Sequence, residues 1–201
     1  MIRLPRPLWI GLAACVLVIV AIGVQVGVPI YRQESAIREI ERLGGTVQLR
    51  PRGPQWLRDR IGDRAQRLCG EIAGVYLRDC PATDETLRTV CRLPGLKGLS
   101  LSNTNVTDAG LAELKSLTRL ERLWLANTAV TDAGLAHLKD LTALQELWLE
   151  NTQVSDAGLG RLKGLTSLKG VWLDNTQVTG AGVAELQRAI PGLTVGALVN
   201  Q

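Results

Sequence analysis

Three tryptophans recur at intervals of 24 residues in the second half of this 201-residue chain, at Trp124, Trp148 and Trp172. An indole ring combines a large apolar area with one N–H donor, so a row of such rings can contact a protein, a peptide or a sugar. Charged side chains lie within two residues of these rings, namely Arg122, Glu146, Glu150 and Asp174. This mixture predicts that the row binds a protein or peptide, with a cell-wall glycan as the alternative ligand.

Three aspartates, Asp108, Asp132 and Asp156, recur at the same interval and could suggest a ladder of calcium ligands. Each of them, however, follows a Thr or Ser at a predicted helix start, where a carboxylate favours the positive end of the helix. We therefore predict no metal site.

Residue sets that carry out catalysis are absent from the sequence. The only histidine, His137, has no counterpart in the neighbouring repeats and is predicted to be exposed. The chain has no glycine-rich phosphate loop, no Cys-x-x-Cys spacing and no nucleophile with a matching histidine and acid. The sequence predicts a binding protein without catalytic residues or cofactor, rather than an enzyme.

The tryptophans belong to a 24-residue unit that repeats from residue 75 onward. One unit begins at Leu123 and reads Leu-Trp-Leu-Ala-Asn-Thr-Ala-Val-Thr-Asp-Ala-Gly-Leu-Ala-His-Leu. Related units or single strands begin at Val75, Leu99, Leu147, Val171 and Val195. Self-similarity at this period is typical of a solenoid, in which each unit buries its apolar face against its neighbours.

Each unit predicts a strand followed by a short helix. Leu-x-Leu alternates with a period of two, so both leucines should be buried while the residue between them faces away from the core. Because neighbouring strands lie about 4.8 Å apart, the three indole rings should stack. The outward residues of successive units, which we predict to bind the partner together with the charged neighbours, are Tyr76, Ser100, Trp124, Trp148 and Trp172.

Small residues in each unit have structural interpretations. The glycine of Asp-Ala-Gly lowers helix propensity by about 1 kcal/mol relative to Ala, so its recurrence predicts close packing between neighbouring helices. Hydroxyl side chains are predicted to cap the helix starts at Thr107, Thr131, Ser155 and Thr179. Others are predicted to satisfy backbone groups where each strand ends, at Thr104, Thr128, Thr152 and Thr176. The Asn before each of these either shares that role or borders the binding face.

The pattern Leu-x-x-Leu-x-Leu-x-x-Thr-x-Val-Thr-Asp-x-Gly-Leu-x-x-Leu over residues 75–198 resembles the leucine-rich-repeat family. It is similar to the cysteine-containing subtype, bacterial membrane-anchored members included, because Cys80 lies where that subtype commonly has a cysteine. The resemblance implies an α/β, right-handed leucine-rich-repeat solenoid over residues 71–201, with a concave parallel sheet that binds ligands and convex helices. The subtype also occurs in substrate-recognition subunits of F-box ubiquitin ligases, so an adaptor is a further alternative, although an F-box-like segment is missing.

An apolar run precedes the repeats, from Leu8 to Ile30, with Gln25 as its one strongly polar residue. As a helix it would be about 35 Å long, compared with about 30 Å for the hydrocarbon core of a bilayer. We predict a transmembrane helix or signal anchor over residues 8–30. Arg3 and Arg6 precede it, which favours a cytoplasmic segment over residues 1–7 and repeats on the exported side, periplasmic or extracellular. Two alternatives to an uncleaved anchor are cleavage of a signal peptide near residues 21–23 and cleavage of a lipoprotein signal before Cys15.

The charge is distributed unevenly. Residues 1–70 carry 11 Lys+Arg and 5 Asp+Glu, a net +6, whereas residues 71–201 carry 12 and 14, a net −2. The repeats therefore lack the basic surface that nucleic-acid binding needs. The basic excess beside the apolar run is predicted to be a solvated face with some attraction to anionic lipid.

Residues 31–70 are predicted to be a linker and an N-terminal cap, because a repeat stack leaves an apolar end that must be covered. We expect a helix over residues 35–43 that stops at Gly44-Gly45, a short strand over 46–49, and a second helix over 55–68 that buries Trp56. A disulfide between Cys80 and Cys91 requires an oxidising compartment, and buried thiols are the preferred interpretation.

Overall fold

The computed structural model describes residues 28–50, 70–93 and 95–196. Seven strands form one sheet in chain order: β1 Thr46–Arg50, β2 Glu71–Tyr76, β3 Gly98–Ser100, β4 Arg122–Trp124, β5 Glu146–Trp148, β6 Gly170–Trp172 and β7 Thr194–Gly196. The α-helices of these ranges are α2 Val28–Arg42, α4 Asp84–Val90, α5 Asp108–Leu111, α6 Asp132–Leu135, α7 Asp156–Arg161 and α8 Gly180–Ala189. Three of them continue as 3₁₀ turns, η2 Ala112–Ser116, η3 Ala136–Asp140 and η4 Leu162–Gly164.

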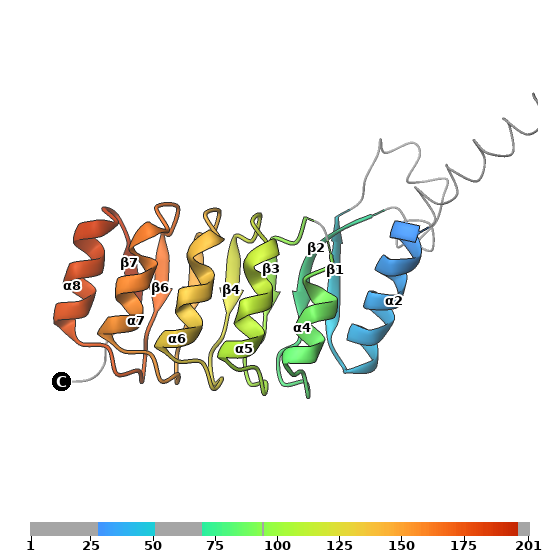
Figure 1. The fold of residues 1–201 in the computed structure, drawn as a ribbon, viewed down its shortest axis with the longest axis horizontal. Coiled ribbons are helices and arrows are strands. Elements are labelled where there is room, and N and C mark those ends of the chain that lie inside the picture. The colour runs from blue at the N-terminus through green and yellow to red at the C-terminus, as the bar shows by residue number, and fades with distance from the viewer. Residues whose placement is uncertain (1–27, 51–69, 94, 197–201) are drawn as a thin grey trace, which may run out of the picture.

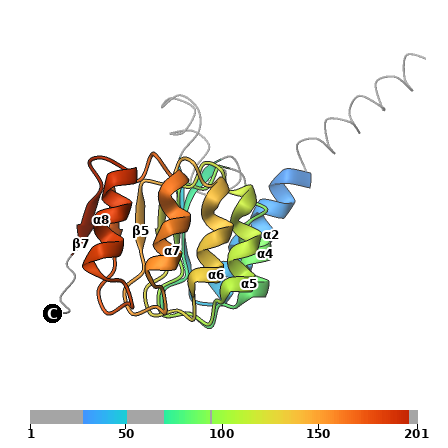
Figure 2. The same ribbon diagram turned by 60° about the vertical axis from the view of Figure 1, so that its left-hand side comes forward.

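Strands and helices form two layers (Figures 1 and 2). The helices line up along one side of the sheet, and from β2 onward every strand pairs parallel with the next one. The register advances by one 24-residue unit per strand, so that Leu99 pairs with Leu123 and Leu123 with Leu147. The prediction of a repeated α/β solenoid with a parallel sheet is confirmed.

The aliphatic positions of each unit fill the space between the two layers. Leu123 and Leu125 of the strand segment, and Leu135 and Leu138 of the helix that follows, are fully buried. The same holds for the equivalent positions of the neighbouring units, which together form one continuous core. The predicted alternation of the strand and the predicted inward pair of the helix are therefore both confirmed.

The aspartate of each unit joins that unit to the next one. Thr131 caps α6, since its hydroxyl accepts from the amide of Ala133 at 3.2 Å, as predicted. The Asp108 carboxylate, one unit earlier, accepts the Thr131 amide at 2.8 Å and the Thr131 hydroxyl at 2.6 Å. The same pair of bonds recurs between Asp84 and Thr107, Asp132 and Ser155, and Asp156 and Thr179. Charge-assisted hydrogen bonds therefore hold successive units in register.

The recurrent glycine makes room for this carboxylate. A Cβ atom at Gly134 would lie 2.3 Å from Oδ1 of Asp108, and one at Gly158 would lie 2.3 Å from Oδ1 of Asp132. The predicted close packing is confirmed, and its partner is the aspartate of the preceding unit.

The residues that end each strand also have defined roles. Thr128 donates its hydroxyl to the carbonyl of Leu125 at 2.7 Å, and the three equivalent threonines make the same bond. The preceding asparagine has a left-handed backbone, with φ of 55° at Asn127, a conformation that Asn tolerates better than most residues. Thr therefore satisfies the strand end while Asn turns the chain.

The N-terminal part of the fold covers one end of the sheet. β1 pairs antiparallel with β2, and α2 buries Ala36, Ile37 and Ile40. The helix expected over residues 35–43 starts earlier in the chain, since α2 begins at Val28. It ends before Gly44, whose φ of 89° favours glycine. The expected second helix over 55–68, with Trp56, lies outside the described residues.

The predicted membrane segment over residues 8–30 also lies outside the described residues, apart from its last three, which form the start of α2. Within the described part of the chain, no helix has the length and apolarity needed to cross a bilayer.

Cys80 and Cys91 are free thiols, so the disulfide is absent. Cys80 is buried and Cys91 is half-buried, and burial raises the pKa of both thiols, that of Cys91 to about 12. The interpretation as buried thiols is therefore confirmed for Cys80 and only in part for Cys91.

Candidate functional site

The tryptophans lie on the sheet face that turns away from the helices, which we call the open face. Trp124 pairs in register with Trp148, and Trp148 with Trp172. Their ring centroids are 4.6 Å and 4.3 Å apart, with interplanar angles of 15° and 4°. All three rings are half-buried rather than sunk among the leucines. We call Tyr76, Trp124, Trp148 and Trp172 the aromatic ladder.

The stacking decides which part of each ring a ligand can reach. Both faces of Trp148 are covered by its neighbours, so only its edge meets solvent. The ring of Trp172 extends toward β7, where a Cβ atom at Gly196 would lie 2.2 Å from its Cδ1. The ladder therefore presents a row of ring edges and not a row of ring faces.

Ser100, predicted to be part of the binding row, is buried instead. It lies in register between Tyr76 and Trp124, whose ring centroids are 6.1 Å apart and whose planes are tilted by 48°. The two large rings close above the small side chain of Ser100. The hydroxyl of Tyr76 also donates a hydrogen bond to Gln48 at 3.0 Å, which holds the Tyr76 ring in place. Ser100 therefore faces away from the helices, as the strand alternation predicts, but the two rings above it leave its side chain buried.

The remaining predicted residues lie on both sides of the ladder. Arg122 is exposed and pairs in register with the half-buried Glu146, before the aromatic position of each strand. Glu150 and Asp174 lie beyond the aromatic position and are half-buried. The fold thus brings all the predicted residues to the open face, where Ser100 is the one that is buried.

A groove of about 390 Å³ follows the ladder where the strands end. Its lining residues are Arg78, Ser102, Asn103, Trp124, Ala126, Asn127, Trp148, Glu150 and Asn151. The sequence reasoning missed Arg78, Ser102 and Ala126, although each occupies in its own unit the position that Glu150 holds in its unit. That shared repeat position was the signal that could have found them.

Glu150 is the electrostatically unusual residue of this groove. Its Oε2 atom is inaccessible to solvent and has no hydrogen-bond partner. Burial raises the pKa of the Glu150 carboxyl above its usual range. A hydrogen bond from the backbone amide of Glu150 itself lowers this pKa by less, and the nearby negative charge of Asp174 adds a still smaller increase. The ionised carboxylate is therefore held in an environment that disfavours its charge.

Residues 94–138 match the family model described as leucine-rich repeats in two copies. The units within these residues are therefore similar to leucine-rich repeats. The LRR ectodomain of the receptor kinase SOBIR1 from Arabidopsis thaliana has a similar fold, with a TM-score of 0.54, 18% identity, and coverage of 83% of this chain and 91% of that one. An internalin, InlF of Listeria monocytogenes, is 23% identical over 57% of this chain, with a TM-score of 0.49, and only 32% of the internalin is covered. A comparison with curated protein sequences finds no match.

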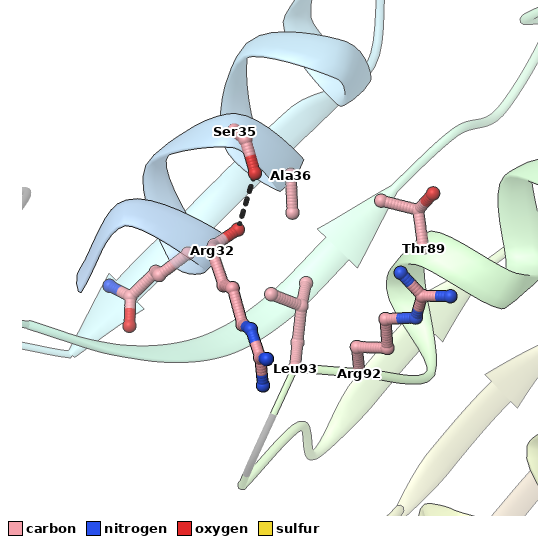
Figure 3. Close-up of a pocket in the computed structure, with 7 residues that line it drawn as sticks. Arg32, Ser35, Ala36, Thr89, Arg92 and Leu93 are labelled. Carbon is pink, nitrogen blue, oxygen red and sulfur yellow. Dashed lines mark hydrogen bonds between the residues drawn. The ribbon is translucent and has the colours of Figure 1, made fainter. Parts of the chain in front are cut away.

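A second hollow, of about 660 Å³, lies between α2 and the end of α4 (Figure 3). Arg32 enters it from α2 and Arg92 from the turn after α4, beside Thr89 and Leu93. These two arginines make no ion pair with any residue of the described ranges. The hollow offers positive charge and has no acidic residue among the described residues that line it.

The described ranges contain no group of three or more His, Cys, Asp or Glu side chains that could hold a metal ion. The aspartates that could suggest calcium ligands are occupied by the hydrogen bonds between repeats. His137 is exposed on η3, on the helix side of the sheet, as predicted.

Replacing Glu150 by glutamine is expected to stabilise the protein at neutral pH by about 1 kcal/mol, because it removes the charge of a half-buried carboxylate whose Oε2 atom has no hydrogen-bond partner. The pKa of this carboxyl is raised in the folded state, so the folded state binds the proton more tightly than the unfolded state. The folded state therefore loses stability as the pH rises from the ordinary pKa of a glutamate through the raised pKa. The gain should therefore vanish below about pH 4, where the carboxyl is protonated in both states. Thermal unfolding of the full chain at pH 7 and pH 4 measures both values.

The matched control for this experiment is Asp140→Asn, which removes an exposed carboxylate on the helix side. It should change the melting temperature little at either pH. A destabilised Glu150→Gln variant at pH 7 would show that the carboxylate has a partner in solution.

Proposed function

We propose that the leucine-rich repeats bind a protein or peptide partner with the open face, centred on the aromatic ladder. The observation that carries the proposal is the stack of half-buried indole rings on the face opposite the helices. Tryptophan is enriched among the residues that dominate binding energies, and repeat solenoids use their extended sheet faces for binding. Charged side chains of both signs flank the stack and would orient the partner.

The ring orientation favours a protein over the alternative glycan ligand. A sugar packs its C–H groups on the negatively polarised face of an aromatic ring. The faces of Trp148 are occupied by Trp124 and Trp172, so this mode of contact is blocked at the centre of the ladder. Ring edges flanked by polar groups suit the apolar and polar side chains of a protein surface.

The location of the repeats is part of the proposal. The apolar run over residues 8–30 supports a single membrane anchor, with the repeats on the exported side and the partner on that side too. Cys80, in the repeat position that Thr104 occupies one unit later, supports assignment to the cysteine-containing subtype.

Photo-crosslinking from the two faces of the sheet tests this proposal in the native cell. Benzoylphenylalanine in place of Arg122 lies on the open face, whereas in place of Lys139 it lies on the helix side in η3. Both positions are exposed, which makes them a matched pair. We expect a specific protein adduct from position 122 and none from position 139.

Adducts of the same protein from both positions, or from position 139 alone, would reject the open face as the contact surface.

The same cells test the proposed membrane anchor over residues 8–30, because an anchored chain stays with the membrane after alkaline extraction. Protease added outside should then digest its repeats, and release of the chain or resistance to the protease would contradict that part of the proposal.

A further inference from the structure

The groove beside the aromatic ladder is shaped by a change of side-chain size along one row of repeat positions. Ser102 and Ala126 occupy the row with short side chains, and Glu150 follows them in the next unit. The other lining residues include Trp124 and Trp148 of the aromatic ladder and the asparagines of the turns, Asn103, Asn127 and Asn151. A ligand chain can therefore enter above Ala126 and reach Glu150 without displacing a large residue.

The charges along this row differ between the two ends of the groove. At the N-terminal end Arg78 pairs with Asp79 at 3.3 Å, so its charge is partly compensated. At the other end Asp174 lies close enough to Glu150 for its negative charge to raise the pKa of the Glu150 carboxyl. The end near Glu150 therefore attracts a cation.

The unpartnered Oε2 atom specifies what that cation must carry. A buried carboxylate oxygen without a donor costs stability, and an N–H donor with a positive charge offsets that cost most effectively. Rotation about the last side-chain torsion of a glutamate is soft, so this oxygen can turn toward a donor that enters the groove.

We propose that this groove receives a lysine or arginine side chain of the protein partner, with Glu150 Oε2 accepting a hydrogen bond from its charged head group. Asp174 adds attraction, and the ring edges of Trp124 and Trp148 contact the aliphatic stem. The inference rests on the proposed function of the open face and names the chemistry that one part of this face recognises. It also accounts for an acidic residue at a position where a neutral side chain is more stable, as expected of binding residues.

A capped tetralysine peptide without tryptophan provides the probe, and the same peptide with all four side chains acetylated provides its neutral counterpart. Tryptophan emission of the full chain at low ionic strength follows binding. We expect saturable binding of tetralysine, at least tenfold weaker binding to Glu150→Gln, unchanged binding to Asp140→Asn, and no binding of the acetylated peptide. The ¹³C titration of the Glu150 carboxyl should show a lower pKa with tetralysine bound, because the cation stabilises the carboxylate.

Equal binding of tetralysine to the wild-type chain and Glu150→Gln, equal binding of the acetylated peptide, or no saturable binding at all would overturn the inference. The affinity of the cross-linked partner for two variants distinguishes a failure of this inference from a failure of the proposed function. If that partner loses affinity for Trp148→Ser but not for Glu150→Gln, the ladder binds and the cation site is wrong. If its affinity is insensitive to Trp148→Ser, the proposed function itself fails.

Discussion

Replacing Gly158 by alanine should lower the free energy of unfolding by about 3 kcal/mol, which combines overpacking with the disturbance of charge-assisted hydrogen bonds. The new Cβ atom would lie 2.3 Å from Oδ1 of Asp132 and 3.1 Å from Cγ1 of Val154. Asp132 cannot withdraw freely, because both of its oxygens accept hydrogen bonds from Ser155. Urea unfolding of the full chain, followed by tryptophan fluorescence, measures the change.

The same helix provides the matched control. Gly160 also lies in α7, and a Cβ atom there would have no neighbour within 4 Å. Gly160→Ala should therefore raise stability by about 0.5–1 kcal/mol, since alanine restricts the unfolded chain and favours the helix. Two glycine variants that differ by two positions should thus have effects of opposite sign.

A double-mutant cycle identifies the atom that the new methyl group meets. Asp132→Ala removes the carboxylate, so Gly158→Ala should cost about 1 kcal/mol or less in that background, with only the Val154 contact left. Additive effects of the two substitutions would show that the carboxylate does not set the glycine requirement.

Much of the fold could be predicted because one signal dominates it. Leu123 and Leu125 recur with their equivalents in every unit, and burying them all leaves one arrangement of strands and helices. The role of the aspartates was only half predicted, because the helix start explains their position without reference to a second unit. The sequence does contain the missing signal: the unit that begins at Val171 has Gly180 in place of the aspartate, and no further capped helix follows it in the described chain.

The binding face was predicted less completely, because side-chain orientation is not periodic. The alternation of the strand correctly predicts that Ser100 faces away from the helices, but its burial depends on how Tyr76 and Trp124 tilt above it. The covering of both faces of Trp148 by the neighbouring rings likewise depends on the stacking distances, which the repeat pattern does not give. The unpartnered oxygen of Glu150 depends on its rotamer and on the short side chain of Ala126, which no pattern of one sequence reveals.

Replacing Trp148 by serine should weaken binding of the cross-linked partner at least about 30-fold, the loss expected for a central binding residue. The fold should persist, because Ser100 occupies the same register position of the same sheet in β3. Loss of two stacking contacts should cost about 1–3 kcal/mol of stability. Val130→Ala, in the core between the sheet and the helices, should cause a similar loss of stability without changing the open face.

Calorimetric titration of the purified partner into the wild-type chain, Trp148→Ser and Val130→Ala tests the role of the ladder most directly. We expect wild-type affinity for Val130→Ala and at least about 30-fold weaker binding for Trp148→Ser, with circular dichroism showing both variants folded. Equal affinities of all three proteins would contradict the account, because the stacked indole rings would then serve only to stiffen the sheet.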